Sequence, residues 1–238
     1  MHGTGADPMV ACMSIARSER LVTLSLAWAM VVAPGLLVVV ALLHFRSGAP
    51  LHFELQYVPR PAGESVARLI ALGNRWPVLH EPHMIGYLGM PVMTFAALGL
   101  YRLGRPVRPL ASAGALSVSL VGMVYLGGLF GAWTAFFRGF GDVDARYAEG
   151  ATAAWAALTA PRGALLVTMT LAKLAMVGPA LQGLCLLGKR VVPTWAPLVA
   201  ALGYGVIVAF WDVDSWMFVG EALVLAGMVP MRARLAAS

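Results

Sequence analysis

Long hydrophobic runs separated by short polar segments dominate the sequence. A helix needs about 20 mostly apolar residues to cross roughly 30 Å of hydrocarbon. Strict alternation of apolar and polar residues, as in a membrane β-barrel, is absent. Six runs reach or approach the length of a helical span: Leu21–Leu43, His83–Leu103, Leu110–Phe137, Ala164–Leu187, Trp195–Trp211 and Trp216–Met231. The pattern predicts an all-α, polytopic membrane bundle of six transmembrane helices.

This pattern also predicts the domain organisation of the chain. We expect a cytoplasmic polar tail over 1–20, a six-helix transmembrane domain over 21–234 with outer loops at 44–82 and 138–163, and a short cytoplasmic tail over 235–238. Each outer loop contains a stretch with helical period, Glu64–Ile70 and Ala151–Leu158. Such segments lie flat at the membrane interface or pack on the end of the bundle, and the sequence favours neither.

Composition and charge support a membrane protein and give its expected orientation. With 60% hydrophobic and 12% charged residues, the chain resembles neither a soluble enzyme nor a disordered protein. With the N-terminus inside, the inner segments hold nine basic and two acidic residues, net +7, and the outer segments seven basic and eight acidic, net −1. Basic residues concentrate on the cytoplasmic side, so we expect both termini inside. The net charge of +6 therefore reflects topology, and nucleic acid is not an expected partner.

An internal repeat occupies the two short inner connections. Gly99–Pro109 matches Gly183–Pro193 at an offset of 84 residues, with six identities in eleven positions. In both copies we expect a glycine to end one helix in a left-handed turn and a proline to open the next. Two well-formed hairpins or a duplicated two-helix unit would both produce this pattern.

Two further segments carry a resemblance to a known group of proteins. They are Trp76–His83, a histidine-containing stretch that opens the second helix, and Gly188–Trp195, a Gly-basic-Pro-Trp turn that follows the fourth. From about Leu21 to Arg234 the chain resembles small six-helix bacterial integral membrane proteins of unknown function. The resemblance implies a fold and no catalytic assignment.

Glycines are frequent in the third run. Gly127 and Gly131 are four residues apart, a spacing that lets two membrane helices approach closely. We therefore expect the third helix at the centre of the bundle.

Four charged residues are candidates for binding. Lys173 lies near the middle of the fourth run and Glu221 in the outer third of the sixth. A charge in hydrocarbon costs at least about 2.5–3.5 kcal/mol, so we expect each to face the interior and to pair with the other. Such a pair relays protons, binds a polar headgroup or fixes helix register. Asp212 and Asp214 are either a cation-binding fragment or a solvated turn.

His80, Glu81 and His83 form the densest cluster of metal-ligating residues, and His44 ends the first run on the same side. Two histidines three residues apart in a helix are able to bind one metal ion. Interfacial capping and hydrogen bonding, or contact with a haem or quinone, are the alternatives. The sequence does not identify a cofactor.

Three functions follow from these candidates. The first is a non-enzymatic accessory or structural subunit of a membrane assembly, with the bilayer and other membrane subunits as partners. The second is an outward-opening protein that binds a small molecule or lipid through Lys173 and Glu221. The third is a membrane redox or metal-dependent enzyme subunit that uses His80 and His83. Motifs for nucleotide binding or proteolysis are absent, which favours the non-enzymatic functions.

Overall fold

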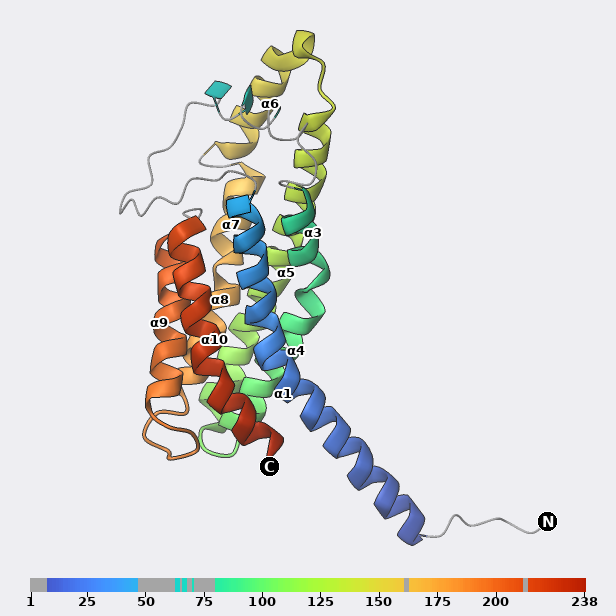
Figure 1. The fold of residues 1–238 in the computed structure, drawn as a ribbon, viewed down its shortest axis with the longest axis vertical. Helices are drawn as coiled ribbons and strands as arrows, with labels where there is room; N and C mark the ends of the chain where they lie inside the picture. Colours follow the sequence, from blue (N-terminus) through green and yellow to red (C-terminus); the bar gives the residue numbers. More distant parts are fainter. Residues whose placement is uncertain are drawn as a thin grey trace, which may run out of the picture.

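The computed structural model describes residues 8–46, 63–64, 66–67, 70, 80–160, 163–211 and 214–238. Helices account for nearly all of this part of the chain, and it contains no strand (Figure 1). The helices are α1 (Pro8–Arg46), α3 (His80–Leu88), α4 (Met90–Gly104), α5 (Pro109–Gly141), a 3-10 turn η1 (Ala145–Tyr147), α6 (Ala148–Thr159), α7 (Ala164–Ala172), α8 (Leu174–Leu184), α9 (Trp195–Ala209) and α10 (Asp214–Ala236). The predicted all-α fold is confirmed.

All six hydrophobic runs are helical, and two of them are broken. The second run bends by 45° between α3 and α4. The break lies at Gly89, and Pro91 follows within the first turn of α4. Proline has no N–H for the carbonyl one turn earlier and its ring crowds that carbonyl, so a kink is expected here. The fourth run is interrupted at Lys173, where α7 ends and α8 begins.

Four helical stretches are long and apolar enough to cross a membrane: Ala16–His44, Pro109–Phe136, Ala164–Leu184 and Ser215–Ala236. The bent pair of α3 and α4 gives a fifth candidate. The remaining run forms α9, whose 15 residues extend about 22 Å at 1.5 Å per residue, short of a full span. The helices are consistent with an integral membrane protein, with four or five of the six expected spans at full length.

The first helix is longer than the sequence pattern suggests. It begins at Pro8 rather than near Leu21, so most of the expected polar tail is helical. Proline suits the first turn of a helix, and residues 9–20 contain neither glycine nor proline to interrupt it. Over its 39 residues α1 extends about 58 Å, and its N-terminal part projects beyond the other helices (Figure 1).

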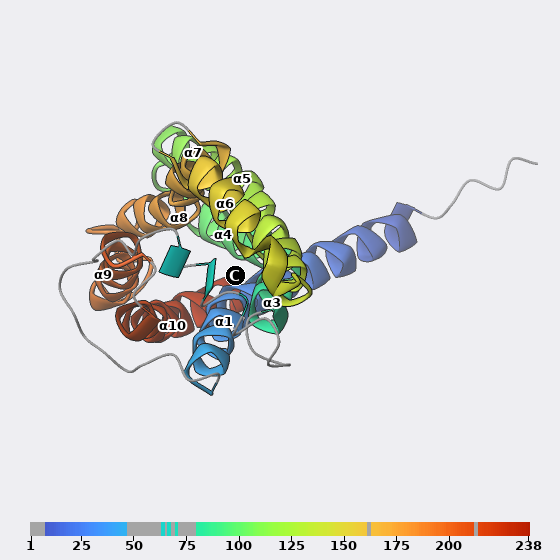
Figure 2. The same cartoon turned by 90° about the horizontal axis from the view of Figure 1, so that it is seen from above.

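Six helices form a closed ring in the order α1, α10, α9, α8, α5, α4, and α4 contacts α1 again (Figure 2). The start of α1, the end of α10 and the two short connections of the internal repeat lie at one end of the ring, which we call the basic end (Figure 1). Helix α6 lies at the other, the α6 end. The sequence segments expected on one side of the membrane thus lie at one end of the molecule.

Small residues allow two helix pairs of the ring to approach closely. A Cβ atom at Gly122 of α5 would overlap the backbone of Leu174 and Ala175, and one at Gly178 of α8 would overlap Ser119. Helices α9 and α10 meet in the same way, because a Cβ at Gly203 would lie 2.5 Å from the Gly220 carbonyl oxygen. Lipid tails are as apolar as the helix surfaces, so the hydrophobic effect does not drive membrane helices together. Close backbone packing of this kind does.

The close approach of α5 to another helix was expected at Gly127 and Gly131, but it does not lie there. The nearest neighbours of a Cβ at Gly127 and Gly131 are the side chains of Met90, at 3.4 Å, and Tyr87, at 3.5 Å. Gly122 is five residues before Gly127 and therefore faces a different direction on the helix. The third run is nevertheless central, because α5 packs against α3, α4, α7 and α8.

The two copies of the repeat form turns of different geometry. Gly188 adopts φ +72, the left-handed conformation expected of a helix-ending glycine. Gly104 is not among the described glycines with positive φ; it stays helical as the last residue of α4. There a Cβ would lie 2.5 Å from the Ser112 hydroxyl oxygen, so glycine is needed for space and not for backbone conformation. Proline opens α5 at Pro109 as predicted.

The second outer loop contains the expected helix, α6, which packs on the bundle. Its Trp155 is 8% exposed and contacts Trp133 and Phe136 of α5, with ring centroids 5.4 and 6.4 Å apart. Of the two alternatives for this segment, packing on the end of the bundle is the one observed. In the first outer loop, the described residue Val66 is also buried.

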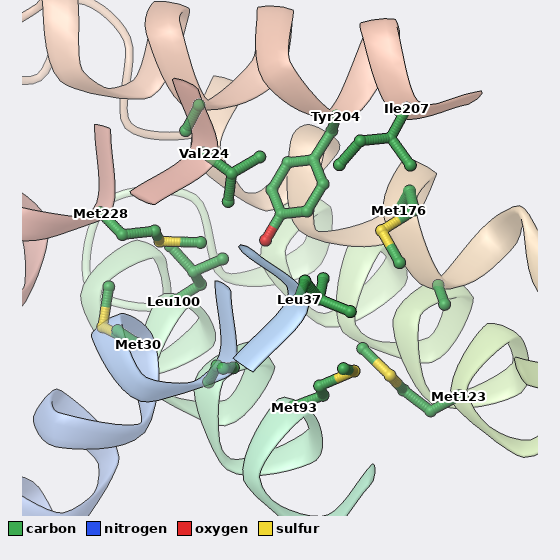
Figure 3. Packing of buried hydrophobic residues seen from close by; sticks show 14 of the residues in the cluster. Met30, Leu37, Met93, Leu100, Met123, Met176, Tyr204, Ile207, Val224 and Met228 are labelled. Atoms are coloured by element: carbon green, nitrogen blue, oxygen red, sulfur yellow. The ribbon is translucent and has the colours of Figure 1, made fainter. Parts of the chain in front are cut away.

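Every helix of the ring contributes to one buried layer inside the bundle (Figure 3). The contributing side chains are Met30 of α1, Met93 of α4, Met123 of α5, Met176 of α8, Tyr204 of α9 and Met228 of α10. The hydroxyl of Tyr204 points towards the middle of the bundle. Methionine is flexible and fills irregular gaps, so this methionine layer is the most adaptable part of the core.

We predict that Gly122→Ala destabilises the protein by about 1–3 kcal/mol, because the new methyl group forces α5 and α8 apart. Gly128→Ala on the same helix is the matched control, since nothing lies within 4 Å of a Cβ there. Thermal aggregation of the detergent-purified variants, followed by size-exclusion chromatography, measures the difference. Equal stability of the two variants would contradict the close approach.

Candidate functional site

Four ring helices carry, at or near their buried faces, a polar or amphipathic side chain in the half that lies towards the α6 end. On α10, Glu221 precedes the buried residues Val224, Met228, Met231 and Leu235 at helical spacing. On α1, His44 follows Leu37 and Ala41, and beyond the end of α9, Trp211 follows Tyr204 and Ile207. In the turn that leads into α8, Lys173 precedes Met176. We refer to His44, Lys173, Trp211 and Glu221 together as the outer polar layer; among them the described contact is that of Lys173 with Trp211.

Glu221 is the most deeply buried charged residue of this layer, with 3% of its surface exposed. It lies seven residues after the start of α10, about 10 Å along the helix. A carboxylate at this depth is costly in a membrane and persists where the interior of the protein or a bound group stabilises it. The interior position predicted for Glu221 therefore agrees with its burial.

Lys173 occupies the turn at which α7 passes into α8. Its Nζ lies 5.9 Å from the centroid of the Trp211 ring, at the end of α9. The long aliphatic stem of lysine lets the ammonium group reach along the bundle, and an aromatic face attracts it. The contact joins α8 to the end of α9. Direct pairing of Lys173 with Glu221 stays a prediction.

The aspartates of the last hairpin fall largely outside the described residues. Asp212 lies outside them, and of Asp214 the structure describes the backbone, which begins α10. Their role in cation binding stays a prediction.

The expected histidine cluster is brought together in part. The rings of His44 and His83 lie 5.1 Å apart, across the contact of α1 with α3. His83 also faces Phe130 at 6.0 Å and Trp133 at 6.3 Å. Glu81 is partly buried in the first turn of α3, and the His80 side chain lies outside the described part. Within the described ranges no three His, Cys, Asp or Glu side chains are grouped to hold a metal ion.

Sequence analysis missed a buried polar link between three helices. Gln182 of α8 is fully buried; its Nε2 donates to the Ala97 carbonyl of α4 at 2.9 Å, and its Oε1 accepts from the Ser119 hydroxyl of α5 at 3.1 Å. Ser119 Oγ also lies 3.0 Å from the Ala115 carbonyl oxygen. Gln182 is the one amide side chain in the six hydrophobic runs, a signal that could have identified it.

Comparison of the sequence with protein-family models, curated proteins and solved structures finds no match. The class of the protein therefore rests on its helices, which are consistent with an integral membrane protein.

We predict that Lys173 and Glu221 are energetically coupled, directly or through a polar group. Lys173→Met or Glu221→Gln alone should reduce the yield of folded protein more than the double substitution, because one change strands the other charge. The double-mutant cycle is measured as the yield of monodisperse protein that the wild type, the two single variants and the double variant give from equal amounts of membrane. Damage in the double variant equal to the sum of the single effects would show that the two residues do not interact.

Proposed function

We propose that the protein binds a small amphipathic molecule, such as a lipid, whose polar head contacts the outer polar layer. The observation that carries this proposal is the burial of Glu221 on the same face of α10 as the apolar residues Val224 and Met228. Lys173 and Glu221 supply charges of both signs, and His44 and Trp211 supply hydrogen-bonding groups on aromatic rings. These residue types suit a headgroup that carries both a donor and an acceptor.

The apolar part of the ligand would occupy space between the methionine side chains. Flexible methionine side chains adapt to ligands of different shape at little cost, as at other adaptable binding surfaces. In this proposal the site opens towards the α6 end, where charged and aromatic residues succeed the apolar core.

We also propose six spans, with both termini in the cytoplasm of a bacterial inner membrane. The division of charge along the sequence, net +7 against −1, supports this orientation. The short α9 would require local thinning of the bilayer or shielding by its neighbours α8 and α10.

Reporter fusions test the proposed topology. Fusions at Arg105 and Lys189 should report the cytoplasm, and a fusion at Asp142 should report the opposite side. An external signal at Arg105 would overturn the proposed orientation.

An accessory subunit of a membrane assembly is the second candidate function. The observation that favours it is the length of α1, whose N-terminal part leaves the bundle, with the side chains of residues 16–22 exposed. A projecting helix of this kind offers a surface for another subunit. The same preparation that tests ligand binding separates the two functions, because a stoichiometric protein partner without a bound small molecule supports the second.

We predict that a small molecule co-purifies with the wild-type protein in mild detergent and is lost from Glu221→Gln. Organic extraction and mass spectrometry of equal amounts of protein detect the bound species. Glu149→Gln is the control, because Glu149 is an exposed acid on α6 and its substitution makes the same change in charge. Equal content in all three preparations would contradict the proposed site, and colour or bound metal would favour a redox function of His80 and His83.

A further inference from the structure

A second polar site lies at the basic end, between α1 and α10. Cζ of Arg232 lies 4.2 Å from the centroid of the Trp28 ring. Trp28 is 56% exposed, whereas Arg232 is partly buried and its Nε is shielded from solvent. The guanidinium therefore packs over the ring of a tryptophan that lies on the outer surface of the bundle.

The Arg232 guanidinium has no acidic partner in the described part of the chain. Its Nε has no hydrogen-bond acceptor there, and the described salt bridges, Arg138–Asp142 and Arg146–Asp144, lie elsewhere. An arginine that packs over an aromatic ring is able to direct the N–H donors that do not face the ring towards another group. Such donors match the oxygen atoms of a phosphate, with which arginine makes two parallel hydrogen bonds.

The surroundings of the pair point to a lipid as the source of the phosphate. Tryptophan concentrates at the level of lipid headgroups. Val32 of α1 and Val229 of α10, each about one turn from the pair towards the α6 end, present exposed apolar side chains. An acyl chain would lie along the apolar side chains while its phosphate reaches the arginine.

We propose that Arg232 and Trp28 bind the phosphate group of an anionic phospholipid in the leaflet at the basic end. This site is independent of the outer polar layer, from which Arg232 is separated by the length of the buried face of α10. Arg232 supplies the charge and the paired donors, and Trp28 holds the guanidinium in place.

Binding of phosphatidylglycerol to the purified protein, measured by native mass spectrometry in mixed micelles with phosphatidylcholine, tests the proposal. Arg232→Ala and Trp28→Leu should each weaken phosphatidylglycerol binding by about five- to tenfold. Arg234→Ala is the matched control, because it removes the same charge from an exposed position of the same helix and should change binding by less than twofold. Trp28→Leu keeps the test decisive if Arg232→Ala fails to fold, since Trp28 is largely exposed.

Equal losses for Arg232→Ala and Arg234→Ala would overturn the proposal in favour of non-specific surface charge. Unchanged binding in Trp28→Leu would overturn it as well. Displacement of the lipid by inorganic phosphate at millimolar concentration would show that the site takes free phosphate, which contradicts a lipid ligand. Retention of the lipid in that experiment supports the proposal.

Discussion

The close contact of α5 with α8 is the constraint on which the remaining arrangement depends. Gly122 and Gly178 remove the side chains that would separate the two backbones, and Ser119 and Ala175 are small enough to fit opposite them. Gln182 then reaches both α5 and α4, so three helices share one buried polar link. Between apolar helices in lipid, such contacts are the main source of specificity, because burial of apolar surface distinguishes poorly between alternative pairings.

This contact also determines where Lys173 lies. The turn between α7 and α8 is adjacent to Leu174 and Ala175, the two residues whose backbone would meet a side chain at Gly122. Lys173 is therefore held at a depth set by the crossing of α5 and α8, and its ammonium group reaches the end of α9 through its own stem. A polar group beside a tightly packed crossing has little freedom to move away from the interior. The outer polar layer is thus a consequence of helix packing as well as of the residues that form it.

Hydrophobic runs predicted the helices well because a membrane span leaves few alternatives to a continuous helix. They could not predict the break at Gly89, whose position depends on how Pro91 and its neighbours pack, or the early start of α1. The repeat shows a second limit: Gly104 and Gly188 occupy equivalent sequence positions, but one provides space for Ser112 and the other a left-handed turn. Sequence analysis grouped His44 with His83 because both lie on the same side of the predicted spans, but the 5.1 Å separation of their rings depends on how α1 packs against α3, which no local pattern encodes.

Helix α10 combines the two polar sites in one element. Glu221 and Arg232 are eleven residues apart, close to three full turns, so they lie on nearly the same side of the helix about 16 Å from each other. The acid lies in the N-terminal half of α10 and the base near its C-terminus. The apolar residues between them, Val224, Met228 and Met231, are buried against the bundle. The order of acid, apolar stretch and base along one face explains how a single helix places a charge at each end of the bundle and leaves the core between them apolar.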